Sequence, residues 1–561
     1  MKINRSLRYL LLGTTALFLH ACKDNNSPSQ QTIDAIDLNR GAIISCGNSE
    51  NEFGTLSFDV TVTEKAKEDF DLAVKLLHSF EYLEAEKAFA KVIDNDPACA
   101  MAYWGIAMSN FHPLWSPPTP AELQKGLKAI AIAKSVNNKS ARETAYIDAI
   151  AYYYTGWEKS DHHTRSIRLE EAMKKVYTSY PDDMETAIFY ALALTAAADP
   201  TDKTYAKQKA AGKILNSLSE KAPNHPGIVH YIIHTYDSPE LAQLALPAAK
   251  KYAAVAPSSA HALHMPSHIF TRLGLWEEDI QSNLSSVEAA VCYAKAAGFK
   301  GHWDEELHGL DYLVYAYLQR GDNAHAKAQW EYLQTIKEIA PLNFKVAYSF
   351  AAIPARYLLE NRIWEAASRL QAPKANFDWQ QFPWENAIVH FTRLLGSVNT
   401  GKLDSAKAEL AILEQLQQEL LSKKDPFKAS KVDIQVKTGQ AWIHFKEGKN
   451  QEAISLMSLA ADLEDRSAKH PVTPGDVIPA RELLGDLLLQ MNRPAEALQA
   501  YEASLEKTPN RFNGLYGAAL AAEKTGDKTK ARLYNEQLLK VADPTSTRPE
   551  LAAVKNYIQN Q

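Results

Sequence analysis

The sequence predicts an all-α fold in which paired helices repeat along the chain. Apolar residues recur at helical spacing through almost all of the 561 residues. The chain is long for one ordinary globular domain, which favours several domains or a repeat array. Apolar residues make up 46% and charged residues 23%, so the chain can bury a large core. The alternating pattern that is typical of strands is found mainly at residues 56–62.

The segment 1–21 has the pattern of a secretory signal peptide. Three positive charges precede an apolar stretch at residues 9–19, which is too short to span a bilayer. Leu19-His20-Ala21-Cys22 then resembles a bacterial lipobox, in which the cysteine is lipidated and becomes the first mature residue. The resemblance implies a lipoprotein of the bacterial cell envelope, anchored to the outer membrane at Cys22 and facing either the periplasm or the outside. The alternative is an ordinary secretory signal with a chance cysteine.

A flexible tether is predicted after the anchor, because residues 23–40 are polar and show no periodicity. Cys46, Cys99 and Cys292 remain after Cys22. An odd number of cysteines in an oxidising compartment leaves at least one thiol unpaired in a monomer. Two alternatives follow: a Cys46–Cys99 bridge that pins the N-terminal arm to the first repeat, or three buried thiols.

The predicted helices form pairs that share a signature. A small residue lies midway in the first helix, an alanine follows in the second helix, and a proline closes the unit. Small side chains let the paired helices approach each other, and proline ends the second helix. The clearest copies are Gly485, Leu488, Ala497, Tyr501 and Pro509, then Gly517, Gly526, Ala531, Tyr534 and Pro544, and earlier Ala73, Ala85, Phe89 and Pro97.

This signature resembles the tetratricopeptide repeat, which has a period of about 34 residues. The resemblance implies a right-handed α-solenoid of tandem helix-turn-helix repeats, with about ten to twelve helix pairs around a concave groove. Residues 99–105, 225–234 and 261–268 also resemble a bacterial family of exported tetratricopeptide proteins. That second resemblance implies a fold and supplies no mechanism.

The predicted organisation has six parts. They are a signal peptide at 1–21, a lipidated cysteine and flexible tether at 22–55, N-terminal repeats at 56–200, central histidine-rich repeats at 201–345, C-terminal repeats at 346–545, and a tail at 546–561.

The overall charge argues against a nucleic-acid partner. The net charge is −6 and the isoelectric point is near 6.3, so no basic excess exists to neutralise phosphates. The sequence contains no Walker-type loop, no G-x-G-x-x-G motif and no convincing nucleophile motif, so no catalytic residue is assigned. These observations favour a binding protein over an enzyme.

Histidines are concentrated in the central repeats. Eight of the 17 histidines lie between residues 225 and 308, where an even spread would place about two or three. His230 and His264 are separated by one repeat period, and so are His234 and His268. Each pair therefore occupies equivalent positions in successive repeats.

The next repeat continues the pattern when its turn glycine, Gly321, is aligned with Gly274. His308 then matches His261, Asp311 matches His264, and Tyr315 matches His268. The polar positions are displaced by one residue, or roughly 100°, from the packing stripe of each helix. In tetratricopeptide folds the displaced stripe lines the concave groove. The predicted ligand groove consists of His230, His234, Asp237, His261, His264, His268, His308, Asp311 and Tyr315.

Three interpretations of these histidines compete. They form a polar seam between helices, a groove for a peptide or small polar ligand, or a transition-metal site for Zn, Cu or Ni. The metal hypothesis uses His230, His234, His264 and His268, because histidines at positions i and i+4 lie on one helical face. No H-E-x-x-H or Cys-x-x-Cys motif supports it. Pro266 is expected to kink the helix that carries two of these residues.

The sequence therefore favours a membrane-anchored scaffold or binding lipoprotein. Its concave groove, lined by histidine, tyrosine and aspartate, would bind a protein, a peptide or a small polar ligand. The alternative is a metal-binding protein or metalloenzyme that uses the stacked histidine pairs of the central repeats.

Overall fold

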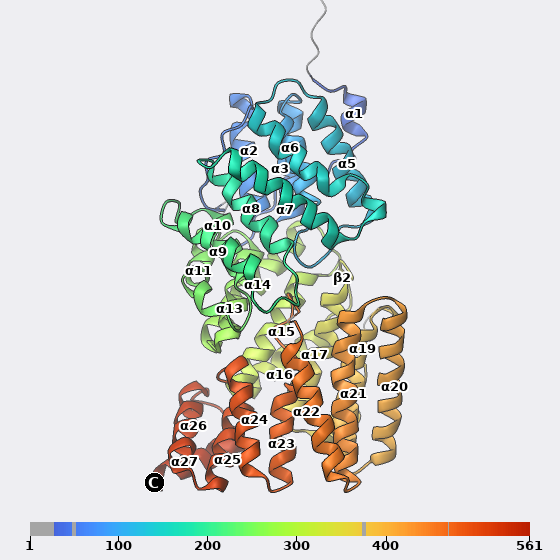
Figure 1. Cartoon of the computed structure of the whole chain (residues 1–561), viewed down its shortest axis with the longest axis vertical. Helices are drawn as coiled ribbons and strands as arrows, with labels where there is room; N and C mark the ends of the chain where they lie inside the picture. Colours follow the sequence, from blue (N-terminus) through green and yellow to red (C-terminus); the bar gives the residue numbers. More distant parts are fainter. Residues whose placement is uncertain (1–26, 48–51, 373–376, 469, 561) are drawn as a thin grey trace, which may run out of the picture.

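Helices form almost all of the computed structural model, which describes residues 27–47, 52–372, 377–468 and 470–560. N-terminal helices lie at the top of Figure 1, C-terminal helices at the bottom, and the central helices between them. The predicted all-α solenoid of paired helices is confirmed. The predicted signal peptide and Cys22 lie outside the described residues. Within the described residues, no helix combines the length and apolarity needed to cross a membrane.

The N-terminal helices are α1 (Gln30–Asp34), α2 (Glu64–His78), α3 (Tyr82–Asn95), α4 (Ala100–Ser109), α5 (Pro120–Ser135), α6 (Ala141–Tyr154), the 3-10 helix η1 (Trp157–Lys159), α7 (His162–Ser179) and α8 (Met184–Ala196). The central elements are α9 (Ala206–Ser219), α10 (Pro226–Thr235), α11 (Ala242–Val255), α12 (Ala260–His264), α13 (Pro266–Leu273), α14 (Trp276–Ala296), β1 (His302–Trp303), α15 (Asp304–Gln319), α16 (Asn323–Thr335) and β2 (Ile339–Ala340). β1 and β2 form a short parallel pair.

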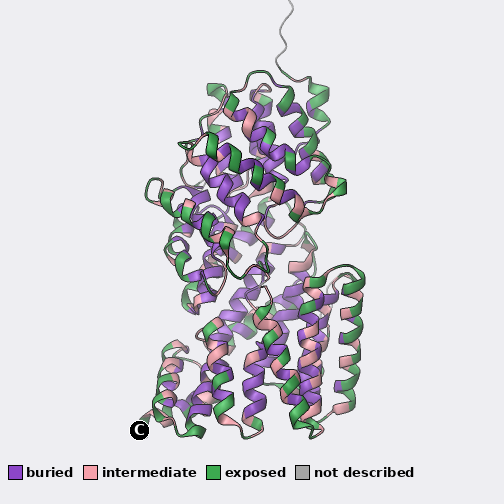
Figure 2. Cartoon of the chain, in the orientation of Figure 1, coloured by how far each residue is buried: buried purple, intermediate pink, exposed green. Residues whose placement is uncertain are grey.

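The C-terminal helices are α17 (Phe344–Glu360), α18 (Trp364–Ala367), the 3-10 helix η2 (Trp379–Gln381), α19 (Pro383–Asn399), α20 (Leu403–Ser422), α21 (Pro426–Lys446), α22 (Asn450–Arg466), α23 (Ala480–Gln490), α24 (Pro494–Lys507), α25 (Phe512–Thr525), α26 (Lys528–Val541) and α27 (Pro549–Gln559). Consecutive helices pack on each other along the array. Figure 2 shows the inner helices buried and outer helices such as α20 exposed along one side.

The small-residue signature has a clear packing role. A Cβ atom at Gly485 would lie 2.7 Å from the ring of Tyr501, and one at Gly517 would lie 2.3 Å from the same ring. Phe89 faces Gly105 in the same way near the N-terminus. The glycines therefore make room for an aromatic ring between neighbouring helices, as the repeat pattern predicts.

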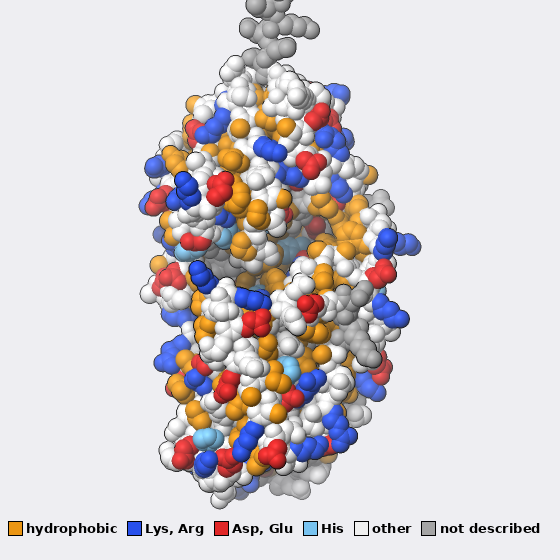
Figure 3. All heavy atoms as spheres, turned by 90° about the vertical axis from the view of Figure 1, so that its right-hand side faces the viewer, with side chains coloured by type: hydrophobic (Ala, Val, Ile, Leu, Met, Phe, Trp, Pro, Cys, Tyr) orange, Lys and Arg blue, Asp and Glu red, His pale blue; other side chains and the backbone are white. Residues whose placement is uncertain are grey.

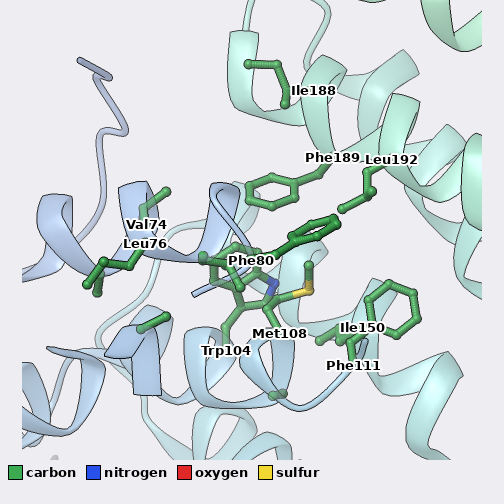
Figure 4. Packing of buried hydrophobic residues seen from close by; sticks show 14 of the residues in the cluster. Val74, Leu76, Phe80, Trp104, Met108, Phe111, Ile150, Ile188, Phe189 and Leu192 are labelled. Carbon is green, nitrogen blue, oxygen red and sulfur yellow. The ribbon is translucent and has the colours of Figure 1, made fainter. Parts of the chain in front are cut away.

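The N-terminal core is rich in aromatic residues. Trp104 and Phe189 meet edge to face, with ring centroids 5.2 Å apart, and both lie in the cluster of Figure 4. Phe58 also packs on Trp104, at 6.0 Å. Residues 56–62, the main alternating stretch in the sequence, form no strand and instead place Phe58 in this core.

The described part of the predicted tether packs on the folded body. α1 and the residues after it bury Ile33, Ile36 and Leu38 against the first repeats. The main chain of Thr55 donates a hydrogen bond to the carbonyl oxygen of Asn224, at 2.9 Å. The prediction of a flexible tether over residues 22–55 is therefore wrong for this part. Three apolar side chains spaced along a polar stretch are enough to fix it.

The cysteine predictions are also corrected. Cys46 forms a disulfide with Cys292 on α14, with the Cα atoms 5.9 Å apart, and Cys99 is a buried free thiol. Burial raises the pKa of the Cys99 thiol to about 12. The arm crosses to the central repeats instead of staying beside the first one, which places Cys46 next to Cys292 and away from Cys99.

Two long-range contacts close the array on itself. A Cβ atom at Gly274 would lie 2.4 Å from the carbonyl oxygen of Pro509, and Trp276 Nε1 donates a hydrogen bond to the carbonyl oxygen of Asn510, at 2.8 Å. The turn between α2 and α3 meets the start of α12, where Ser259 Oγ donates to Glu81 at 2.6 Å. The central repeats therefore lie between the N-terminal turn and the C-terminal repeats.

Candidate metal centre

Six histidine rings form a continuous group on the first helices of three successive central repeats. Adjacent ring centroids lie 4.2 to 6.3 Å apart. α12 and α13 meet at Met265, directly before Pro266, and the backbone of Met265 stays right-handed helical, with φ −54° and ψ −35°. The six residues are His230 and His234 on α10, His261 and His264 on α12, His268 on α13, and His308 on α15.

The six rings divide into two triads. The first triad is His230, His234 and His261, and the second triad is His264, His268 and His308. Within each triad, one nitrogen from every ring lies within 4.8 Å of the others. The four histidines predicted to share one ion are thus split between the triads, and each pair gains a third ring from the next repeat.

The tautomer of His264 in the second triad follows from its neighbours. His264 Nδ1 lies 2.7 Å from Asn283 Oδ1. The amide nitrogen of Asn283 donates to the main-chain and side-chain oxygens of Asp279, which fixes the orientation of the amide. Asn283 Oδ1 is therefore an acceptor, and the neutral His264 ring carries its hydrogen on Nδ1.

The same reasoning applies to His268. Its Nδ1 atom donates to Asp237 Oδ2 at 2.9 Å, and Arg272 Nε donates to the other carboxylate oxygen at 3.3 Å. Both Nε2 atoms, of His264 and His268, therefore carry lone pairs when the rings are neutral, and they lie 3.0 Å apart. Only a shared proton or a bound cation makes such an approach favourable.

Burial keeps other rings of the group neutral. It lowers the pKa of His230 to about 3, and it lowers the pKa values of His261 and His308 well below the ordinary value, with further contributions from neighbouring imidazoles. A neutral imidazole is the form that binds a metal ion.

A narrow cleft separates the two triads. His234 and His261 of the first triad line it, as do His268 and His308 of the second. Figure 3 shows the surface hollowed between the upper and lower halves, with histidine side chains at the bottom of the hollow. The remaining lining residues are Trp115, Met265, Glu305, Lys345, Pro471 and Val472.

Aromatic side chains from the N-terminal repeats cover the first triad. The ring of Phe80 lies 4.4 Å from that of His230, and the ring of Trp115 lies 5.2 Å from that of His234. Phe80 sits in the turn after α2 with a φ of 57°. Sequence reasoning missed both residues, because they are distant in the sequence and carry no histidine-like signal.

Asp311 and Tyr315 belong to a different network. Arg356 Nε donates to Asp311 at 3.1 Å, and Arg511 donates to the hydroxyl of Tyr315 at 3.0 Å. The two residues are only 1% and 2% exposed. Asp311 therefore does not line an open groove, whereas the side chain of Tyr315 lies in the wall of a cavity of about 260 Å³. Asp237 is near the histidines, as its bond to His268 shows.

The chain itself fills the concave face. Residues 470–476, here called the groove segment, join α22 to α23 across this face. Tyr312 donates to the carbonyl oxygen of Val472 at 2.9 Å, and Arg356 donates to those of Gly475 and Asp476 at 2.8 and 2.9 Å. A cavity of about 260 Å³ remains beside the segment, and His234 lies in its wall.

A third group of possible ligands is a closed structural network. Glu185 lies 2.9 Å from His78 Nε2 and 2.7 Å from His225 Nε2, and all three residues are buried. Burial alone would raise the pKa of Glu185, but the two histidines lower it below its usual value. His78 Nδ1 also lies 3.0 Å from the hydroxyl of Tyr231. These atoms thus bind one another directly, whereas His225 Nδ1 is buried without a hydrogen-bond partner among the described residues.

Comparison with known proteins agrees with the repeat pattern. Residues 483–547 match the tetratricopeptide repeat family. No curated protein matches the chain. The similar solved structures include a monomeric mutant of IFIT1 with Gppp-AAAA, at 11% identity and a TM-score of 0.35, covering 91% of this chain and 100% of that one. They also include the human IFIT1 dimer with m7Gppp-AAAA, at 13% identity and a TM-score of 0.32, covering 86% and 96%.

Structural similarity at these TM-scores does not indicate which ligand this protein binds. The family match covers the signature copies at Gly485 and Gly517. The same packing of consecutive paired helices runs from α2 to α26. Residues 483–547 therefore belong to the tetratricopeptide repeat family, and the helices before them share its paired packing.

Proposed function

We propose that this protein binds a transition-metal ion, Zn, Cu or Ni, at the second triad. The observation that carries the proposal is the approach of His264 Nε2 and His268 Nε2 to 3.0 Å while both Nδ1 atoms donate to acceptors. Metal-bound histidines commonly donate their other ring nitrogen in this way to a carboxylate or carbonyl group. His308 supplies the third ligand, and the cleft leaves a position open.

The spacing of the nitrogens suits one ion. Two nitrogens that bind one tetrahedral zinc ion at about 2.0–2.1 Å lie about 3.3 Å apart. The observed 3.0 Å is close to this value. A polar seam needs a proton on one of these two Nε2 atoms, whereas a bound cation accepts the lone pairs of both.

His264→Ala is expected to abolish stoichiometric metal binding at the second triad, because it removes one of three ligands. Asp237→Asn is expected to weaken affinity about 10- to 100-fold, since it keeps the three ligands and changes the hydrogen-bond partner of His268 and Arg272. Metal content by elemental analysis and affinity by chelator competition measure both effects. His325→Ala is the matched control, because the His325 side chain is 65% exposed. A metal content of the His264 variant equal to that of the unaltered protein would refute this assignment.

We also propose that the protein is a lipoprotein of the bacterial outer membrane, anchored through Cys22. The Cys46–Cys292 disulfide supports a location in the cell envelope, because disulfides persist in oxidising compartments. Cys22→Ala is expected to move the protein from the membrane fraction to the aqueous fraction and to remove lipid from its N-terminal peptide, as read by mass spectrometry. A membrane fraction that is unchanged in this variant would argue against the anchor.

The second candidate function is that of a scaffold for a protein or peptide partner, which agrees with the use of tetratricopeptide repeats as binding scaffolds. It is favoured by the donors that hold the groove segment, Tyr312, Tyr348 and Arg356, since they recognise backbone carbonyl groups of an extended chain. A partner peptide would replace the groove segment at these donors.

Replacing residues 470–476 by a glycine-serine linker is expected to create a binding site for a synthetic peptide of residues 467–479. Fluorescence anisotropy would measure the gain in affinity over the unaltered chain. The same substitution combined with Arg356→Ala is expected to lose that gain. Equal, weak binding by all three proteins would remove the support for this second function.

A further inference from the structure

We propose that the cleft holds two metal ions, one at each triad, so that the centre is dinuclear. This inference rests on the proposed function, because the ion at the second triad is its starting point. The additional ion is assigned to the first triad, His230, His234 and His261.

The two triads are the same arrangement repeated once along the solenoid. Each consists of two histidines at positions i and i+4 on one repeat and a third histidine from the next repeat. In the second triad the pair is His264 and His268, and the third ring is His308. In the first triad the pair lies one repeat period earlier, and its third ring is His261, the position equivalent to His308. A repeat array that builds one such site builds the other by the same backbone geometry.

One ring of the first triad, His230, is oriented by a hydrogen bond from its Nδ1 atom, as His264 and His268 are in the second triad. His230 Nδ1 lies 2.6 Å from the main-chain carbonyl oxygen of His78, which accepts its hydrogen. The lone pair of the neutral ring is therefore on Nε2, and this atom lies 3.1 Å from His261 Nε2. The carbonyl group of His78 therefore orients the His230 ring, as Asn283 and Asp237 orient the rings of His264 and His268. In each case the hydrogen bond to Nδ1 turns Nε2 toward a neighbouring histidine.

Both ions would face the same cleft. The rings of His234 and His268, which belong to different triads, have centroids 6.3 Å apart. Each triad contributes two of the rings that line the cleft. Three ligands leave open positions on each ion, and these positions point into shared space. Two such ions would act as Lewis acids on a water molecule or hydroxide bound in the cleft.

Charged side chains lie around the two triads. Asp237 binds His268, and Glu305 lines the cleft. Glu81 accepts a hydrogen bond from the main chain of His261. Lys345 binds Asp304 and Glu305, each at 2.5 Å, and Arg272 binds Asp237 at 3.3 Å. Carboxylates and cationic side chains therefore both lie beside the triads.

The test is a metal titration of the whole chain after chelation, with Cu(II) and separately with Zn(II). We expect two equivalents bound to the unaltered protein, one to His261→Ala, one to His308→Ala and none to the double variant. Glu185→Gln is the control, because it alters the third histidine group and is expected to keep two equivalents. Circular dichroism confirms that each variant is folded, and His261→Gln and His308→Gln replace any variant that is not.

The number of equivalents bound shows which of the two proposals, the metal site at the second triad and the dinuclear centre, is wrong. No metal in the unaltered chain refutes the proposed function and this inference together, and leaves a shared proton between His264 and His268. One equivalent that only His308→Ala removes keeps the proposed function and overturns the dinuclear centre. One equivalent that either variant removes points to a single ion shared by both triads, which also overturns it.

Electron paramagnetic resonance tests whether the two ions are neighbours. The second equivalent of Cu(II) is expected to broaden or silence the signal of the first, because neighbouring paramagnetic ions couple. Each single variant, loaded with one equivalent, is expected to show a sharp mononuclear signal of full intensity. Two sharp, independent signals in the unaltered chain would place the ions apart and overturn the dinuclear centre.

Discussion

Arg511→Ala is expected to destabilise the C-terminal repeats by about 3–5 kcal/mol, because it leaves two buried carboxylates without their counter-ion. Arg511 is fully buried between α25 and the central repeats. It donates to Glu482 at 2.9 Å, to Glu360 at 2.5 Å and to the hydroxyl of Tyr315 at 3.0 Å. Urea unfolding, followed by hydrogen exchange of α23, α25 and α17, measures the loss.

Two further variants define this prediction. Arg493→Ala removes an exposed arginine that binds Glu496, and is expected to change stability by less than about 1 kcal/mol. Arg511→Lys is expected to recover only part of the loss, because an ammonium group lacks the planar fork that reaches several partners. If Arg511→Ala were as mild as Arg493→Ala, the network would not hold the repeats together.

Reduction of the Cys46–Cys292 disulfide is expected to lower stability by about 2–5 kcal/mol. The bond joins residues 246 positions apart, so it restricts a large part of the unfolded chain. It also holds the N-terminal arm against α14, and hydrogen exchange at residues 52–58 is expected to rise on reduction. Thermal unfolding with and without a reductant measures the overall shift.

The double variant Cys46→Ser and Cys292→Ser is the control for the reductant. It is expected to unfold at the temperature of the reduced protein, with no further shift when reductant is added. A reductant effect of equal size in this variant would mean that the shift has another origin. Cys99 is unsuitable as a control site because it is fully buried.

Sequence periodicity predicted the helix pairs because that signal is local. Gly485, Gly517 and Tyr501 report contacts between neighbouring helices, and such contacts recur in every repeat. The same logic placed His261 and His308 in equivalent positions. It also indicated Pro266, which directly follows the boundary between α12 and α13, since a proline removes one hydrogen bond of its own helix.

The closure of the array could not be predicted in this way. Phe80 meets His230, and Arg511 meets Tyr315, although the partners in both pairs lie several repeats apart in the sequence. No period links such residues, so the histidines were assigned to an open groove. The groove segment was missed for the same reason, because its contacts use main-chain oxygens that every sequence provides.

The cysteine pairing shows the same limit. Spacing alone cannot tell which of three thiols meet, because a disulfide needs Cα atoms within a few ångströms in space. The path of the N-terminal arm decides the partner, and that path depends on the burial of Ile33, Ile36 and Leu38. These residues are too few to form a periodic pattern.

The closed array has a mechanical consequence. In an open solenoid each repeat contacts only its neighbours, so a stretching force can separate or unfold the repeats one at a time. Here Gly274 and Trp276 contact Pro509 and Asn510, and Ser259 binds Glu81. A pull on the two ends must break these contacts before the repeats between the contacting residues can separate. Under a stretching force, the protein is therefore expected to extend little at first and then to unfold in one cooperative step.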